Sequence, residues 1–213
     1  MIAQAGPMLG ILVRGDWAAG LPCCVAPAVL LLVTGLLVVG MYNSLVRGRN
    51  HVRESWAGID TELKRRYDLI PNLVQTVKGY AKHEREVFER VTEARSRAAA
   101  STGSPAQQAA DENILVAALR QLFALREGYP ELKASENFLA FQHQLAETED
   151  RIQAVRRFYN ANVRDYNNRC EMFPTNVLAR MFRFGPAEFF EIEAAVERTA
   201  PGVGFGDSER PSD

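Results

Sequence analysis

The sequence is poor in the residues that build disulfide frameworks, metal sites and reactive centres. It has three cysteines and three histidines in 213 residues. Cys23, Cys24 and Cys170 show neither a disulfide-framework pattern nor metal-ligand spacing. No two histidines are three or four residues apart, as they are in helical metal sites. We therefore expect no metal, no cofactor and no disulfide scaffold, and a reducing compartment is favoured.

Sequence motifs for phosphate binding and nucleophilic catalysis are also absent. The chain contains no G-x-x-x-x-G-K-[ST], no G-x-S-x-G and no H-E-x-x-H sequence, so we do not expect an enzyme. A catalytic site assembled from distant residues is the alternative. Lys plus Arg (25) nearly balance Asp plus Glu (26), which gives no reason to expect nucleic acid as a partner.

What the sequence does contain is a long apolar segment near its amino terminus. No charged residue occurs from Trp17 to Val46, and the central part, CVAPAVLLLVTGLLVVGMY, is apolar almost throughout. As a helix, residues 22–43 would cover about 30 Å, the thickness of the hydrocarbon core of a bilayer. A cleaved signal peptide would need an A-x-A-like site after the apolar run, and a buried core helix rarely stays apolar on every face. We predict a transmembrane helix over residues 22–43.

The charges that flank this segment predict its orientation. Basic residues are denser after the segment than before it: Arg47, Arg49 and Arg53, against Arg14 beside Asp16. The positive-inside rule therefore predicts a single-pass protein of the inner, cytoplasmic membrane. Its short tail, residues 1–21, is expected outside and the bulk of the chain in the cytoplasm.

The rest of the chain is organised around residues 138–173. Apolar or aromatic residues recur there every seven positions: Phe138, Leu145, Ile152, Tyr159, Tyr166 and Phe173. No Gly or Pro occurs between Ser135 and Pro174, so the pattern predicts one helix of roughly 55 Å with coiled-coil character. Such a helix needs partners of similar length to bury its stripe.

Three further helices are predicted to pack against it. The transmembrane helix should continue to the RRYDLIPN segment, where Asp68 would cap a second helix over about 69–100 with Pro71 in its first turn. A third helix is expected over about 106–127, after the STGSP break. The predicted fold is all-α: an antiparallel bundle of about four long helices over residues 44–192, preceded by one amino-terminal transmembrane helix. A disordered tail is expected over residues 193–213.

Several ordered blocks of the sequence resemble one known family. The segments YNSLVRGRN and ELKRRYDLIPNLVQTVKGYAKHEREVFERVTEAR, then YPELKASENFLAFQHQLAETEDRIQAVRRFYNANVRDYN and the Phe173-Pro174 dipeptide, are similar to the LemA family of bacterial membrane-anchored proteins. The amino-terminal tail with its Cys-Cys pair and the Gly-rich carboxyl tail depart from that pattern. The resemblance implies an antiparallel helical bundle on a membrane helix, with most of the chain cytoplasmic, and it defines no biochemical activity.

The first candidate site is a cluster of charges at the predicted membrane-distal turn: Lys64, Arg65, Arg66 and Asp68. One interpretation is a docking tip for a protein partner. The other, which we favour, is turn capping with solvated charge.

The second candidate site follows the long helix. If successive helices alternate in direction, that helix ends near the bilayer. The segment after it mixes aromatic and basic residues that suit a membrane interface: Arg180, Phe182, Arg183, Phe184, Phe189 and Phe190. The alternative, which we favour, is that the phenylalanines close the end of the bundle.

Asparagines also interrupt the apolar stripe of the long helix, notably Asn160, Asn162, Asn167 and Asn168. They are interpreted as a polar layer that fixes helix register, or as a binding site between helices. Together these features predict a membrane-anchored interaction or scaffold module. Its expected partners are the bilayer, through residues 22–43, and an unknown protein or a second copy of itself. The alternatives are a transmembrane sensor or signalling adaptor and, as a third choice, a membrane-surface enzyme.

Overall fold

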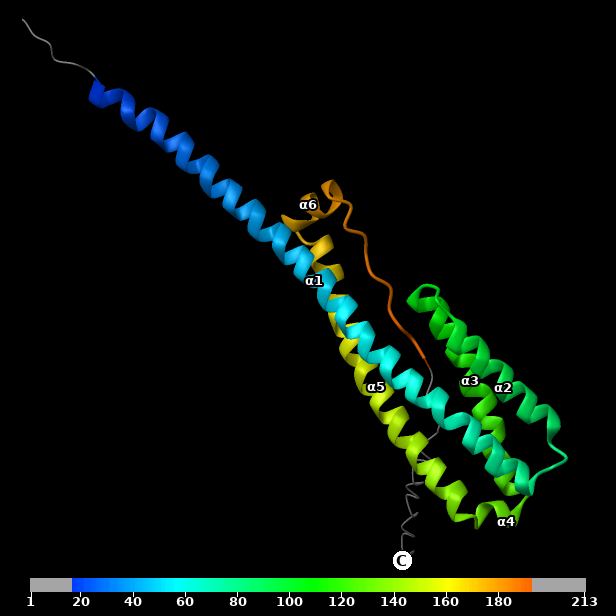
Figure 1. Ribbon diagram of the computed structural model, residues 1–213. Coiled ribbons are helices and arrows are strands. Elements are labelled where there is room, and N and C mark those ends of the chain that lie inside the picture. Colours follow the sequence, from blue (N-terminus) through cyan, green and yellow to red (C-terminus); the bar gives the residue numbers. More distant parts are fainter. Residues whose placement is uncertain (1–16, 193–213) are drawn as a thin grey trace, which may run out of the picture.

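The computed structural model describes residues 17–192, and this part of the chain is all-α (Figure 1). Its elements are α1 (Trp17–Tyr80), α2 (Arg85–Ala100), α3 (Pro105–Ala124), the 3-10 turn η1 (Leu125–Glu127), α4 (Pro130–Lys133), α5 (Glu136–Glu171) and α6 (Thr175–Met181). An extended segment, residues 184–192, follows and is called the strap below. The predicted disordered tail, residues 193–213, and residues 1–16 of the predicted amino-terminal tail lie outside the described residues.

Helix α1 has two parts with different surroundings. Its amino-terminal part projects away from all other elements, and its carboxyl-terminal part is packed in the bundle (Figure 1). In the projecting part Leu30, Leu31 and Leu36 are 67%, 73% and 65% exposed, which in water would be unfavourable for side chains of this kind. Among the described residues this is the one helix long and apolar enough to cross a membrane. The predicted fold class, a helical bundle with an amino-terminal transmembrane helix, is confirmed.

The predicted end of the first helix at Asp68 is wrong. Helix α1 continues through Pro71 to Tyr80, and the chain reverses at residues 81–84 instead. Pro71 has no N–H to donate to the carbonyl of Tyr67 four residues earlier. The Nε of Arg95, on α2, donates to that carbonyl at 2.6 Å and replaces the missing helical hydrogen bond. Buried apolar residues on both sides of Pro71 keep the helix intact by packing.

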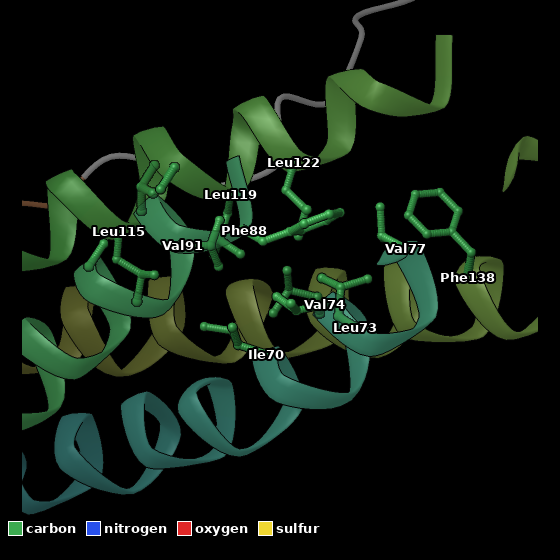
Figure 2. Packing of buried hydrophobic residues seen from close by; sticks show 14 of the residues in the cluster. Ile70, Leu73, Val74, Val77, Phe88, Val91, Leu115, Leu119, Leu122 and Phe138 are labelled. Atoms are coloured by element: carbon green, nitrogen blue, oxygen red, sulfur yellow. The ribbon is translucent and has the colours of Figure 1, made fainter. Parts of the chain in front are cut away.

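The distal half of the bundle, far from the apolar part of α1, is built by the α2–α3 hairpin packed on α1 and the start of α5. Figure 2 shows its apolar side chains pointing toward one another: Ile70, Leu73, Val74, Val77, Phe88, Val91, Leu115, Leu119, Leu122 and Phe138. This cluster is called the distal core. Burying one side chain of this size stabilises the fold by about 1.5–3 kcal/mol.

The proximal half is formed by α1 and α5, which run antiparallel, together with α6 and the strap (Figure 1). Its buried cluster, called the proximal core, comprises Leu45, Val52, Ile59, Leu63, Ala109, Ile152, Tyr159, Val163, Tyr166, Leu178, Ala179, Phe184, Phe190 and Ile192. The end of α5 reaches the start of the bundled part of α1, where Arg169 Nη1 donates to the carbonyl of Ser44 at 3.3 Å. The predicted alternation of helix direction therefore holds, and α5 ends beside the apolar part of α1.

Candidate functional site

A layer of charged side chains crosses the middle of the bundle. Arg66 of α1 donates from Nη1 to Glu149 Oε1 of α5 at 2.7 Å, and from Nη2 to Glu112 Oε2 of α3. The Arg66 side chain is 0% exposed, and those of Glu112 and Glu149 are 2% and 6% exposed. The hydroxyl of Tyr67 donates to the second oxygen of Glu112. Three helices that are distant in sequence are thus joined at one level by a buried ionic network.

This buried layer separates the two cores. Arg66 lies between Leu63 of the proximal core and Ile70 of the distal core, and Glu149 likewise lies between Leu145 and Ile152. A shift of any one helix along its axis would leave a charge facing apolar side chains, at a cost of several kcal/mol. The layer therefore fixes the register of α1, α3 and α5.

The environment of the layer shifts the pKa values of its members. Burial raises the pKa of Glu112, although the neighbouring charge of Arg66 acts in the opposite direction. Burial alone would lower the pKa of Arg66, but the charges of Glu149 and Glu112 outweigh it and raise that pKa. Burial, and then the charge of Glu112, raise the pKa of Tyr67. Tyr67 and Arg66 therefore remain proton donors to Glu112 throughout the physiological range.

The predicted docking tip is not formed. Because α1 continues to Tyr80, its four residues lie on the side of a helix and not at a turn: Lys64, Arg65, Arg66 and Asp68. Arg66 is wholly buried, so it is unavailable to a partner. Arg65 pairs with Glu62 on its own helix at 3.6 Å. Lys64 and Asp68 are exposed and border a shallow cavity of about 370 Å³ facing the end of α2.

Two of the asparagines singled out in α5, Asn160 and Asn167, bind the strap, a role that their sequence pattern did not indicate. The side-chain amide of Asn167 donates to the carbonyl of Ala187 at 2.9 Å and accepts from its N–H at 2.8 Å. Asn160 forms the same pair with Phe190, at 3.0 Å in both directions. Each asparagine thus gives the extended backbone the two hydrogen bonds that a neighbouring β-strand would give.

Tyrosines adjacent to these asparagines complete the attachment. Tyr159 donates to the carbonyl of Glu188 at 2.9 Å, and Tyr166 donates to the carbonyl of Gly185 at 3.0 Å. Burial raises the pKa of both tyrosines to about 12. The repeated Tyr-Asn pair, seven residues apart, was the one signal in the sequence that could have revealed the strap.

The six residues predicted at the membrane interface divide into two groups. Phe184 and Phe190 are buried, at 9% and 0% exposure, and they pack in the proximal core. Phe182 and Phe189 are half exposed, and both arginines, Arg180 and Arg183, are exposed. The ring of Phe182 packs against Tyr42 at a centroid distance of 5.0 Å, beside the apolar part of α1.

Other exposed apolar side chains gather on and around α6. Met172, Phe173, Val177 and Met181 are 63%, 81%, 57% and 63% exposed. Together with Phe182 they are called the α6 face. Helix α6 packs against both α1 and α5 at the end of the bundle where α1 leaves it (Figure 1). The α6 face is therefore at the same end of the bundle as the apolar part of α1.

A cavity of about 690 Å³ opens next to this end of the bundle. Its walls come from α1, α5, the α2–α3 loop and the first residues of the strap, and three arginines line it: Arg49, Arg53 and Arg183. It is called the arginine pocket. Within the described residues, no group of three His, Cys, Asp or Glu side chains is placed to hold a metal ion.

Comparison with known proteins gives consistent results. A model of the LemA family matches residues 55–205. The chain is 30% identical over 145 residues to Protein LemA of Metamycoplasma hominis, a match that covers 67% of this chain and 65% of that protein. It is 26% identical over 179 residues to Magnetosome protein MamQ 1 of Paramagnetospirillum magneticum, with 72% and 66% covered. It is also 26% identical over 196 residues to Magnetosome protein MamQ of Magnetospirillum gryphiswaldense, with 80% and 72% covered. The chain thus spans about two thirds of the length of the curated relatives that it matches, and slightly less for the first two.

Proposed function

The chain belongs to the LemA family, and from this premise we propose that it is an interaction or scaffold module held at the cytoplasmic face of the cell's inner membrane. One observation carries the proposal. Helix α1 is a single element whose amino-terminal part exposes apolar side chains and whose carboxyl-terminal part forms the bundle core. A partner of the bundle would therefore be held at the membrane.

The α6 face supports this arrangement as a second contact with the bilayer. Its Met, Val and Phe side chains project from the bundle end that the apolar part of α1 leaves, with Arg180 exposed among them. Apolar and basic side chains mixed on a short amphipathic element suit the headgroup boundary of a membrane. Two contacts, one spanning and one interfacial, would fix the tilt of the bundle as well as its position.

The membrane placement is tested with single cysteines in a chain whose three cysteines are replaced by serine. Met181→Cys reports on the α6 face, and Lys64→Cys on the exposed side of the bundle serves as its matched control. A spin label at position 181 should be accessible to oxygen dissolved in lipid, and one at position 64 to a water-soluble relaxation agent. Equal exposure of both labels to water would contradict the interfacial contact.

The same variants test the orientation. A membrane-impermeant maleimide should label position 64 only after the cells are permeabilised, because the bundle is proposed to face the cytoplasm. Labelling of position 64 in cells that lack their outer layers but keep an intact inner membrane would contradict the proposed orientation.

The scaffold role is tested by affinity capture from detergent-solubilised native membranes. The full chain is compared with a chain that begins at Tyr42, since this control keeps the bundle and lacks the apolar segment. A specific protein enriched with the full chain, and cross-linked to it before solubilisation, would identify the partner. Enrichment of neither a partner nor a second copy would contradict the scaffold role.

The continuity of α1 favours one second candidate, a transmembrane sensor or adaptor. In that case α1 would transmit rotation or displacement from the membrane to the bundle. A flexible Gly-Ser insertion after Asn43, an exposed residue at the end of the predicted membrane segment, should leave partner capture intact and abolish any transmitted signal. If every phenotype were retained after the insertion, the sensor role would be contradicted and the scaffold role would remain.

A further inference from the structure

The arginine pocket has an excess of positive charge among the residues that the structure describes. Arg49, Arg53 and Arg183 line it, and none of the three forms an ion pair with a described residue. One carboxylate also lines the pocket, that of Glu188, but its Oε2 accepts from the backbone N–H of Ala106 at 3.4 Å. Three guanidinium groups and one carboxylate thus line the cavity, so its lining carries a net positive charge.

Two of these arginines are presented by the same face of α1. Arg49 and Arg53 are four residues apart, so their side chains project from neighbouring turns. The guanidinium of Arg49 lies over the ring of Phe184, with 4.9 Å from Cζ to the ring centroid. This contact holds one arginine in place without neutralising its charge.

The third arginine has a backbone conformation that normally favours glycine. Helix α6 ends in a Schellman motif, in which Phe184 N donates to the Ala179 carbonyl at 2.8 Å and Arg183 N donates to the Arg180 carbonyl at 3.3 Å. Arg183 has a φ of 57°, in the left-handed region. A side chain there is unfavourable relative to glycine. Backbone strain of this kind is retained where the side chain has a task, and this side chain lines the pocket.

The base of the pocket is aromatic. The ring of Trp56 packs edge-on against Tyr159 and Phe190, with centroid distances of 5.2 Å to each. Trp56, Tyr159 and Tyr166 all line the cavity. The pocket therefore combines exposed arginines with buried aromatic side chains, which suits a ligand that carries an anionic group next to an uncharged group.

The pocket is also near the expected level of lipid headgroups. Arg49 follows Asn43, the last residue of the predicted membrane segment, by about 9 Å along the helix axis. Arg183 lies between Phe182 and Phe184, whose rings both pack against Tyr42. The headgroup region extends roughly 5–7 Å beyond the hydrocarbon core on each side. An anionic lipid in the surrounding leaflet can therefore reach the arginines of the pocket with its phosphate.

We propose that the arginine pocket binds the phosphate group of an anionic phospholipid, with Arg49, Arg53 and Arg183 as its ligands. Trp56 lies farther along α1 from the bilayer than these arginines, so the polar headgroup beyond the phosphate faces Trp56 and the acyl chains return toward the membrane. Free phosphate shares the same anionic chemistry but lacks the uncharged part. The choice of lipid over free phosphate rests on the proposed membrane anchoring.

Trp56 provides the measurement. The chain has two tryptophans, so Trp17→Phe leaves Trp56 as the single fluorophore, inside the pocket. The full chain in an uncharged detergent is titrated with dihexanoyl phosphatidylglycerol, with dihexanoyl phosphatidylcholine, and with inorganic phosphate. We expect a saturable change in Trp56 emission with the anionic lipid, at a concentration at least tenfold lower than for either of the other two probes.

Two variants and a matched control identify the site. Arg183→Gly should weaken binding of the anionic lipid at least tenfold while the melting temperature stays equal or rises, because glycine suits a φ of 57°. Arg49→Gln should weaken binding to a similar extent. Arg47→Gln makes the same charge change on an exposed residue of α1 that does not line the pocket, and it should change binding by less than twofold.

Three outcomes would overturn the inference. If Arg47→Gln and Arg183→Gly weaken binding equally, the lipid is attracted by general surface charge and the pocket is not its site. If inorganic phosphate binds as tightly as the lipid, the ligand is a soluble phosphate compound. If no saturable change occurs, the pocket does not bind an anion. Because these titrations use detergent, their failure leaves the membrane anchoring intact, and a failure of anchoring would appear as release of the full chain from membranes by alkaline carbonate.

Discussion

Replacing Arg66 by methionine should destabilise the bundle by about 3–5 kcal/mol, the cost of removing one partner from a buried ion pair. Methionine fills a similar volume, so loss of packing contributes little. The cost comes from Glu112 and Glu149, which are 2% and 6% exposed and would lose the cation that both contact. Tyr67 can still donate to Glu112, but Glu149 would lose its charged donor, Arg66.

The assay is thermal unfolding of the full chain in mild detergent, followed by circular dichroism at the helix band. For a chain of this size, each kcal/mol lowers the melting temperature by roughly 2–4 °C, so the expected decrease is about 6–20 °C. A decrease below about 3 °C, corresponding to roughly 1 kcal/mol, would show that Glu112 and Glu149 do not need the charge of Arg66. It would mean that the two carboxylates become protonated or hydrated at little cost.

A triple variant distinguishes the cost of an unpaired buried charge from the net contribution of the ionic network to stability. Arg66→Met combined with Glu112→Met and Glu149→Met removes the charges together and should recover most of the lost stability. Recovery is expected because the layer is incompletely paired: Arg66 Nε and Glu149 Oε2 have no hydrogen-bond partner among the described residues. If the triple variant is as unstable as the single one, the ionic network itself, and not the avoidance of an unpaired charge, stabilises the fold.

Three further predictions follow from other contacts. Asn167→Ala removes two backbone hydrogen bonds from the strap and should lower the free energy of unfolding by about 1–3 kcal/mol. Hydrogen exchange of the Ala187 amide should become faster. The control, Asn168→Ala, changes an exposed neighbour and should leave the exchange rate of Ala187 unchanged. Pro71→Ala supplies the N–H that α1 lacks, so Arg95→Ala should cost about 1 kcal/mol more in the natural chain than in the Pro71→Ala background; a double-mutant cycle with no coupling would show that Arg95 does not replace that bond. Hydrogen bonds from the hydroxyl of Ser101 and then from Arg97 lower the pKa of Asp111 in the folded state. Ionised Asp111 therefore adds to the free energy of unfolding above its unfolded pKa of about 4, and this contribution is lost as the pH falls through the lowered folded pKa. Asp111→Asn should therefore flatten the acid side of the stability profile measured by thermal melts, and an unchanged profile would contradict this.

The sequence predicts the elements that depend on long periodic patterns. The first five members of the heptad stripe, Phe138 to Tyr166, form the buried seam of α5, and the uncharged apolar run forms the projecting part of α1. Phe173, the last member of the stripe, lies after the end of α5 and is exposed. Both patterns are strong because a single environment, a buried seam or a lipid surface, selects nearly every residue in them. The family resemblance adds the bundle architecture, which the structure confirms.

Predictions failed where a local signal competed with a distant contact. Asp68 and Pro71 together resemble the start of a helix, yet α1 passes through them because Arg95, from another helix, supplies the missing hydrogen bond. Arg66 was grouped with solvated charges because its two carboxylate partners are 46 and 83 residues away in sequence. Neither partner can be identified without the packing of the helices.

The strap escaped prediction for a different reason. An extended segment without a sheet has no periodic apolar pattern of its own. Its position depends on side chains of α5 that satisfy its backbone, and asparagine on a long helix more often indicates a polar layer. The role of the two Tyr-Asn pairs can be recognised only when the position of the strap is known.

Because α1 is uninterrupted, it fixes the distance between the bilayer and the far end of the bundle. From Val46 to Tyr80 the helix rises about 50 Å, so surfaces near its far end stand at a set distance from the bilayer. The same helix also fixes how the bundle is rotated about the helix axis. Each residue added or removed between the apolar segment and the bundle would rotate the whole bundle by about 100°. Length changes there would thus alter which side of the molecule faces a neighbouring membrane protein, and they would also disturb the contacts of Met41 and Tyr42 with the end of the bundle.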